Sequence, residues 1–338
     1  MAKRIAAFGE VMMRLQVPGY ETLAQANTLQ YSFCGTGVNI ASALSRFGHT
    51  GYLVSRIPDN PVGEAAMAYL RKLGITTSFV QRGGQFIGMY FLENGFGVRP
   101  SRVTYTDRLG SSFNTAPPDA YDFAAIAQGL DYAHFCGITL AMNDAVRAHM
   151  KAFAAEVKKQ GGKVVFDCNY RPSLWGPNGY AEAKPHYEDM LHLADMVLMN
   201  EKDAMLILGM ETSASDRMGQ LQDLIPQVAS RYGIAVAAGT HRTVNRDNTH
   251  SLTGYLYKDG AFVFSKMLTF SVYDRIGAGD AYASGIIHGD AQGFPAQLTV
   301  DFAAAAAILA HTVAGDAPIA TEAEVFRAMS DKTSDVVR

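Results

Sequence analysis

Residues 274–289 read DRIGAGDAYASGIIHG, and they decide more of the fold than any other stretch of the chain. Gly277 and Gly279 allow the backbone to turn its amide groups inward, and the small, apolar residues that follow predict a helix beginning at this turn. The start of a helix carries a partial positive charge, so the amides of Gly277, Ala278 and Gly279 predict an anion-binding site. Asp280 stands at the start of this helix. A residue of this type at that position is often an ordinary N-cap.

Outward from this turn, short apolar runs alternate with longer helical patterns. The runs include IAAFGEV from Ile5, YLVSRI from Tyr52, KVVFDCN from Lys163 and IAVAAG from Ile234. Such alternation is typical of βαβ units, and strands that are apolar on both faces are typical of a buried parallel sheet. We therefore predict an α/β fold with a doubly wound, mostly parallel sheet and helices on both of its faces.

Two segments interrupt this alternation. Residues 12–33 and 86–113 show strand-like patterns with many aromatic side chains but no helix of usable length between them. We expect them to form a small β-sheet lid over the carboxyl edge of the main sheet, where α/β proteins bind ligands; two long surface loops are the alternative. No repeat or linker divides residues 1–338, which predicts a single domain.

The composition favours a small ligand over a polymer. The 338 residues are 48% hydrophobic and 18% charged, and the formal net charge is −3, so we expect no general attraction for nucleic acid or for an anionic membrane. Cys34, Cys136 and Cys168 form no CxxC pair, which argues against structural disulfides and a structural zinc. The sequence contains no signal-peptide pattern and no long apolar run. We expect a cytoplasmic protein with small-molecule partners.

The motif DRIGAGD resembles the DTxGAGD signature of the ribokinase/PfkB carbohydrate kinases. This resemblance implies a ribokinase-like fold in which Asp280 is the catalytic base. It also implies that the amides of Gly277, Ala278 and Gly279 stabilise charge on the transferred phosphoryl group. Arg275 replaces the usual Thr, at a position that we expect to face away from the chemistry.

Two further segments resemble substrate-binding parts of the same family. CGTGVNIASALSRFG, from Cys34, is similar to the glycine turn and helix that contact sugar hydroxyls, which implies roles for Gly35 and Asn39. Taken alone, this segment fits a simple packed helix equally well. FDCNYRPSLW, from Phe166, resembles the DxNxRxxLW pattern of the 2-keto-3-deoxygluconate kinase subgroup. Arg171 would then meet a substrate carboxylate through its planar guanidinium.

The segment GMYFLENGFGVRPSRVTYTDR, from Gly88, resembles the lid strands of that subgroup. By this resemblance Tyr90, Tyr105 and Arg108 surround the sugar acid. Tyr105 is displaced by one residue from the subgroup's YxR pattern, and one residue reverses the face of a strand. Either a bulge returns Tyr105 to the site or Thr106 points there instead.

The nucleotide side rests on weaker matches. VLMNEKDA supplies Asn200 and Asp203 at the spacing of the family's NxxE element, which implies indirect placement of Mg²⁺ through water and phosphate. Gly239 and Thr240 fall where relatives have a nucleotide-binding strand end. The resemblance therefore implies ATP and Mg²⁺ as cofactors, and relatives suggest a monovalent cation such as K⁺ near Asp274.

The implied reaction is ATP-dependent phosphorylation of the primary hydroxyl of a sugar acid, with 2-keto-3-deoxygluconate giving its 6-phosphate. The alternatives are a fructokinase or another PfkB-type sugar kinase, and a non-catalytic sugar-binding regulator. Two cations facing one site, Arg108 and Arg171, favour the acid. A dinucleotide-dependent oxidoreductase is disfavoured because no GxGxxG follows the first strand. We also expect a homodimer, because an exposed β-lid invites pairing along an edge or face.

Overall fold

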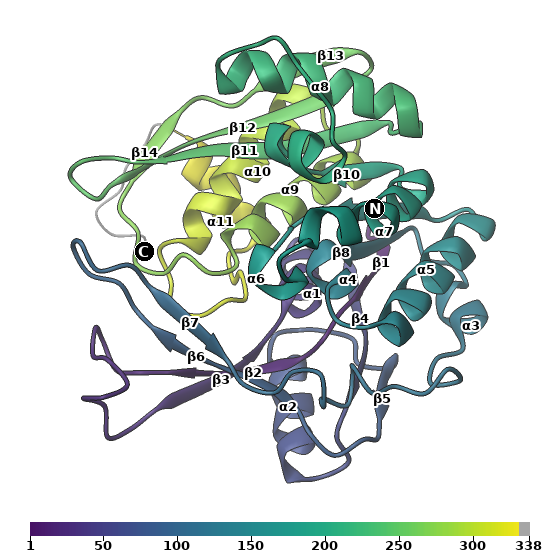
Figure 1. Ribbon diagram of the computed structural model, residues 1–338, viewed down its shortest axis with the longest axis vertical. Coiled ribbons are helices and arrows are strands. Elements are labelled where there is room, and N and C mark those ends of the chain that lie inside the picture. Colours follow the sequence, from purple (N-terminus) through teal and green to yellow (C-terminus); the bar gives the residue numbers. More distant parts are fainter. Residues whose placement is uncertain (331–338) are drawn as a thin grey trace.

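The structure is a computed structural model that describes residues 1–330 (Figure 1). Its larger sheet has ten strands in the order β13-β12-β11-β10-β9-β8-β1-β4-β5, with β14 paired to β12. Neighbours from β11 to β5 run parallel, whereas β12 is antiparallel to β11, β13 and β14. The predicted, mostly parallel sheet is confirmed. The strands are β1 (Arg4–Phe8), β4 (Thr50–Ile57), β5 (Val80–Arg82), β8 (Tyr132–Cys136), β9 (Lys163–Asp167), β10 (Met196–Leu198), β11 (Val236–Val244), β12 (His250–Lys258), β13 (Ala261–Phe264) and β14 (Leu268–Phe270).

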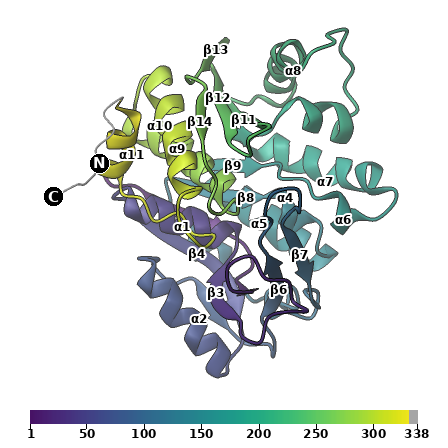
Figure 2. The same cartoon turned by 90° about the vertical axis from the view of Figure 1, so that its left-hand side faces the viewer.

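The central strands are apolar throughout because helices cover both of their faces. In β1, Ile5 and Ala7 join one core, while Ala6 and Phe8 join the other. Figure 2 shows α9, α10 and α11 on one side of the sheet and α7 and α8 on the opposite side. The first face carries α1 (Thr36–Arg46), α2 (Pro61–Lys72), α9 (Ala278–Gln292), α10 (Ala296–Ala310) and α11 (Glu322–Met329). The second carries α3 (Phe123–Ala127), α4 (Gly137–Leu140), α5 (Asp144–Lys159), α6 (Pro172–Trp175), α7 (Gly179–Leu193), the π-helical turn η1 (Asp203–Ile207) and α8 (Arg217–Tyr232).

A smaller sheet of four strands lies beside this body, in the order β3-β2-β6-β7 (Figure 1). It joins two antiparallel hairpins through a parallel pairing of β2 with β6. The predicted small β-sheet is therefore present, rather than two surface loops. Its strands are β2 (Met12–Gln16), β3 (Gln30–Cys34), β6 (Gly88–Glu93) and β7 (Arg102–Tyr105).

Helices α9 and α10 pack closely against each other. A Cβ on Gly285 would lie 2.5 Å from the Cα of Ala303, and one on Gly289 would lie 2.5 Å from the methyl carbon of Thr299. Gly285 and Gly289 are thus needed for the two helices to approach each other this closely. The amino-terminal end of α9 lines the same cavity as the carboxyl ends of β9 and β10. Within residues 1–330, no helix combines the length and apolar character needed to cross a membrane.

Candidate active site

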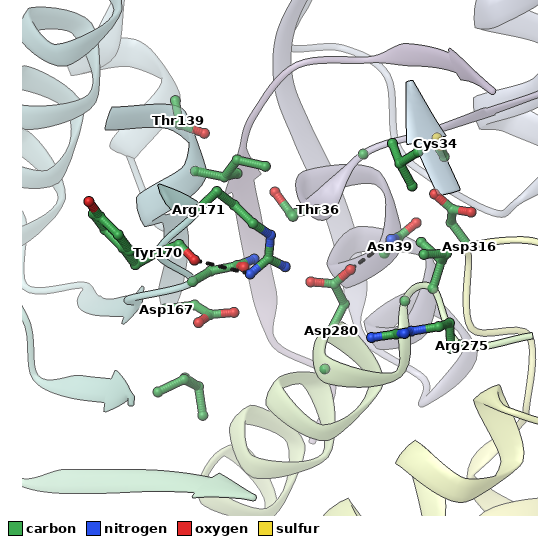
Figure 3. A pocket seen from close by; sticks show the side chains of 18 of the residues that line it. Cys34, Thr36, Asn39, Thr139, Asp167, Tyr170, Arg171, Arg275, Asp280 and Asp316 are labelled. Carbon is green, nitrogen blue, oxygen red and sulfur yellow. Dashed lines mark hydrogen bonds between the residues drawn. The ribbon is translucent and has the colours of Figure 1, made fainter. Parts of the chain in front are cut away.

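A cavity of about 800 Å³ opens between the carboxyl ends of the central strands, the start of α9 and the smaller sheet (Figure 3). Most of the residues singled out from the sequence meet here, although they come from distant parts of the chain. Ala278 and Asp274 are exceptions, since both are buried behind the cavity wall. The predicted residues that line the cavity are Gly35, Asn39, Tyr90, Tyr105, Arg108, Arg171, Asn200, Asp203, Gly239, Thr240, Gly277, Gly279 and Asp280.

The GAGD turn forms the floor of the cavity. Gly277 is the N-cap of α9 with φ of 83°, and a Cβ there would overlap the backbone oxygen of Asp316 at 1.8 Å. Asp280 lies in the first turn of the helix, and its Oδ2 accepts a hydrogen bond of 2.7 Å from Nδ2 of Asn39. No side chain caps this helix, so the interpretation of Asp280 as an N-cap is wrong. Its carboxylate is instead directed into the cavity (Figure 3).

Burial makes the carboxyl of Asp280 a weaker acid than an exposed aspartate. The pKa of this carboxyl is raised from 3.8 to about 7, chiefly by the loss of solvent and to a smaller extent by the charge of Asp316. The hydrogen bond from Asn39 and the charge of Arg171 oppose that increase. A carboxylate with a pKa close to neutral is well matched to accepting a proton from a hydroxyl group near physiological pH.

Two more carboxylates line the cavity near Arg171: Asp167 is the last residue of β9, and Asp203 is the first residue of η1. Burial, reinforced by the charge of Asp280, raises the pKa of Asp167 to about 8. Burial also raises the pKa of Asp203 to about 6, although its Oδ2 accepts a 2.8 Å hydrogen bond from the amide of Asn200. The guanidinium of Arg171 lies close enough to lower the pKa of all three carboxyls, and Figure 3 shows it pointing into the cavity. We call Asp167, Asp203 and Asp280 the acidic cluster.

Arg108 enters from the segment that follows β7. Its Nε and Nη2 both donate to one carboxylate oxygen of Glu10, at 2.9 and 2.6 Å, and its charge lies 5.1 Å from the ring centre of Tyr105. Its Nη1 is buried without a hydrogen-bond partner in the described part of the chain. An unsatisfied buried donor is costly, so a ligand acceptor at this position would be favoured.

Strand pairing decides which residue of β7 faces the cavity. Tyr105 lies directly opposite Tyr90 in the β6–β7 ladder, and Val103, two residues earlier, lines the cavity as well. Thr106 instead donates both its amide and its hydroxyl to the carbonyl of Met89. Regular alternation therefore directs Tyr105, and not Thr106, towards the cavity.

Behind the cavity wall, a buried arginine ties the smaller sheet to the main body. Arg14 of β2 binds the carboxylates of Asp274, at 2.6 Å, and of Asp316, while the hydroxyl of Tyr90 donates to Asp316 at 2.6 Å. Burial alone would lower the pKa of Arg14, but the two carboxylates outweigh it and raise that pKa. We call these four residues the anchoring cluster. Because Arg14 already binds Asp274, a monovalent cation there would share the carboxylate, and its presence stays a prediction.

The structure corrects the expectation for Arg275. This side chain lines the cavity beside Ile276 and Gly277, and Figure 3 shows it next to the start of α9, so the prediction that it faces away is wrong. Across the cavity, Gly239 is confined by the backbone oxygen of Met199, which would lie 2.3 Å from a Cβ.

Sequence reasoning missed several residues of the site. Asp167 had a visible signal, since it ends a buried strand within the quoted segment FDCNYR. Glu10 likewise follows the first strand. Arg14 and Asp316 carried no such signal, because an isolated charged residue in a strand or a loop has no motif.

Comparison with known proteins shows the family of the chain. The model of the pfkB family carbohydrate kinases matches residues 2–322. A 2-dehydro-3-deoxygalactonokinase of Haloferax volcanii is 28% identical over 330 residues, covering 97% of this chain and 97% of that protein.

Two solved structures share the complete architecture. One, from Enterococcus faecalis and provisionally assigned as a 2-keto-3-deoxygluconate kinase, has 37% identity and a TM-score of 0.95, covering 100% of this chain and 99% of that one. The other, a 2-dehydro-3-deoxygluconokinase from Thermotoga maritima, has 30% identity and a TM-score of 0.92, covering 97% and 98%.

Proposed function

Because this chain belongs to the pfkB family of carbohydrate kinases, we propose that it transfers the γ-phosphoryl group of ATP to a primary hydroxyl of a sugar acid. The preferred substrate is 2-keto-3-deoxygluconate, and the product is its 6-phosphate. One observation carries the proposal: the buried carboxylate of Asp280 lies at the amino-terminal turn of α9, in a cavity that Arg108 and Arg171 also line. A base, an anion-binding turn and two cations thus face one space.

The backbone around the GAGD turn fits a phosphate group. Gly277 lets the chain enter α9 in a left-handed conformation, and the position of a Cβ on Gly279 has no atom within 4 Å. A ligand can therefore approach the helix start closely, where free amides and the helix dipole favour an anion. These amides would stabilise the charge that develops on the phosphoryl group.

The acidic cluster fits an indirect Mg²⁺ site. Burial raises the pKa values of Asp167 and Asp203, and the charges of neighbouring carboxylates add to both increases. A nearby divalent cation would favour their ionised forms. Within residues 1–330, no group of three or more His, Cys, Asp or Glu side chains is arranged to hold a metal by itself. Phosphate oxygens and water would therefore complete the coordination shell. When bound, Mg²⁺ supplies neutralisation of phosphate charge.

In the proposed reaction, Asp280 accepts the proton of the attacking hydroxyl. The hydrogen bond from Asn39 fixes the orientation of the carboxylate and favours its ionised form, as does Arg171. The smaller sheet would act as a lid, since Tyr90 and Tyr105 present their rings to the cavity. Covering the site excludes water, which would otherwise compete as the phosphoryl acceptor.

Arg108 and Arg171 support an acidic substrate. The Nη1 of Arg108 is a buried donor with no partner in residues 1–330, and a carboxylate oxygen would satisfy it. Glu10 already neutralises much of the charge on Arg108. This observation favours a neutral hexose, the substrate type of a fructokinase, as the second candidate substrate. Removal of the guanidinium of Arg171 should distinguish the two candidate substrates, because it would weaken the binding of a sugar acid far more than the binding of a neutral sugar.

The test is a coupled ADP-release assay with Mg-ATP and a panel of sugars. The panel holds 2-keto-3-deoxygluconate, its C4 epimer 2-keto-3-deoxygalactonate, gluconate, fructose and ribose, and the Asp280→Asn variant is the control. Turnover of a keto-deoxy acid that the variant loses supports the proposal. Turnover of neutral sugars alone would make the chain a hexose kinase. Binding of sugar with no turnover of any member would favour a regulator.

A further inference from the structure

Two acids of the anchoring cluster, Asp274 and Asp316, stand directly beside the GAGD turn. Oδ1 of Asp274 accepts the amide of Ile276 at 3.1 Å, and its Oδ2 accepts the amide of Gly315 at 3.2 Å. The backbone oxygen of Asp316 lies against Gly277, where a Cβ would overlap it. Both acids therefore help to hold the backbone that shapes this turn.

Two carboxylates at this place would oppose the binding of an anion. Asp274 and Asp316 are both buried, so solvent screens their charges weakly. Asp316 lines the cavity on one side of Asp280 (Figure 3), and its charge contributes to the raised pKa of Asp280. Negative charges this close to the turn would also repel a phosphoryl group. A positive charge beside the two acids would preserve the attraction of the turn for an anion.

Arg14 supplies such a charge from the smaller sheet. Its Nη2 donates to Oδ2 of Asp274 at 2.6 Å, and its Nη1 donates to Oδ1 of Asp316. The same Nη2 contacts the side-chain oxygen of Gln16 on the same strand. A single buried guanidinium thus bridges both acids, and it stays charged at physiological pH because arginine does not lose its proton in proteins.

The donors already present leave a metal ion no carboxylate oxygen of its own. The last of the four oxygens, Oδ2 of Asp316, accepts the hydroxyl of Tyr90 at 2.6 Å. Burial raises the pKa of Tyr90, so this hydroxyl keeps its proton and donates it. A hard cation such as K⁺ needs oxygen ligands. Beside Asp274 it would have to share them with these donors, next to a guanidinium that repels it.

We propose that the guanidinium of Arg14 takes the place of a monovalent metal ion at the GAGD turn. It neutralises Asp274 and Asp316, which preserves the attraction of the turn for a phosphoryl group, and the protein therefore requires no K⁺. The role of the turn rests on the proposed function, whereas the exclusion of K⁺ does not. Arg14 is a positioning residue, since it acts through the two acids.

The test compares K⁺ with N-methylglucamine, an organic cation too large to enter the site. The melting temperature, the affinity for ATP and the turnover of the sugar acid are measured in each chloride salt at about 100 mM, so that screening is constant. For the unaltered chain, exchange of the cation should shift the melting temperature by less than about 1 °C. The affinity for ATP and kcat/KM should change by less than about twofold.

The Arg14→Ala variant should acquire a response to K⁺, because it leaves a space between two buried carboxylates. A dissociation constant of about 10 mM for K⁺ would raise its melting temperature by about 2 °C in about 100 mM KCl, relative to the organic salt. K⁺ should also restore part of the lost affinity for ATP, which a purely structural role of Arg14 would not produce.

Two further variants control for charge and for position. Arg14→Lys keeps a positive charge between the acids and should respond to K⁺ as little as the unaltered chain. Arg102→Ala removes an exposed arginine from the same small sheet and should also show no response. If Arg14→Ala folds in neither salt, the unaltered chain and Arg14→Lys decide the question.

The outcomes separate this inference from the proposed function. If K⁺ clearly raises the turnover or the melting temperature of the unaltered chain, Arg14 does not replace a metal ion, and the kinase assignment stands. If Arg14→Ala folds but recovers nothing in KCl, Arg14 is only a structural anchor and the inference is wrong. If the unaltered chain turns over no sugar, the proposed function fails, and the melting temperatures still show whether K⁺ binds beside Asp274.

Discussion

The anchoring cluster gives a prediction whose size follows from its burial. The side chain of Arg14 is 1% exposed, and those of Asp274 and Asp316 are 3% and 5% exposed. Replacing Arg14 by Met keeps most of the volume but leaves two buried carboxylates without their cation. Breaking such a pair lowers the free energy of unfolding by about 3–5 kcal/mol.

That loss converts into a measurable change in melting temperature. The entropy of unfolding is roughly 2.1 cal/mol/K per residue, which for 338 residues is about 0.7 kcal/mol/K. The Arg14→Met variant should therefore melt about 4–7 °C below the unaltered chain in a calorimetric scan at pH 7.5. No ligand is added, so that binding does not alter the comparison.

The control lies in the same small sheet. Arg102 has a side chain 76% exposed and lies 3.7 Å from Glu93, so Arg102→Met should cost less than about 1 kcal/mol. Adding Asp316→Asn to Arg14→Met should restore part of the lost stability, because it removes one uncompensated charge. Equal melting temperatures for Arg14→Met and Arg102→Met would refute this reasoning, as would a double variant that is simply less stable than either single one.

The remaining predictions concern the GAGD turn. Because burial raises the pKa of Asp280 to about 7, kcat/KM should fall as the pH drops through 7, and a flat profile between about pH 6 and 8 would contradict Asp280 as the base. The same raised pKa means that ionised Asp280 destabilises the fold. The Asp280→Asn variant should therefore resist unfolding by urea better than the unaltered chain at pH 8. This advantage should disappear at about pH 4, where the carboxyl is protonated. Gly277→Ala should abolish activity and cost more than about 2 kcal/mol, because it adds an overlap with Asp316 to the strain of a left-handed conformation. Gly260→Ala, with φ of 77° and no atom within 4 Å, should show the conformational cost alone, and equal losses for the two variants would argue against the overlap.

Local pattern was enough for the fold class, and together with the resemblance it named much of the lining of the candidate site. Apolar runs of strand length, alternating with helices, predict a parallel sheet with covered faces. Each central strand is apolar on both sides because helices, which are also visible in the sequence, cover both faces of the sheet. The glycines of the GAGD turn and their following helix are neighbours in sequence, so their geometry is also local. Asn39 and Arg171 were found through segments whose resemblance extends over many residues.

Where a prediction depended on an orientation, the sequence left it open or gave it wrongly. Tyr105 faces the cavity because β7 pairs with β6 in one register, which no pattern within β7 specifies. Arg275 was expected to face away, yet the turn directs it into the cavity. Asp280 looked like an N-cap, but its partner is Asn39, 241 residues away.

The sequence by itself determined which elements form, how they alternate, and where a turn able to bind an anion lies, since these depend on residues close together in the chain. Only the tertiary structure decided which charges neutralise one another. Arg14 meets Asp274 and Asp316 across 260 and 302 residues, and Arg242 meets no acid at all within residues 1–330. The physical reason is that the energy of a charge depends on its burial and on its neighbours in space, and both are fixed by the order of the strands and by the packing of the smaller sheet on the larger.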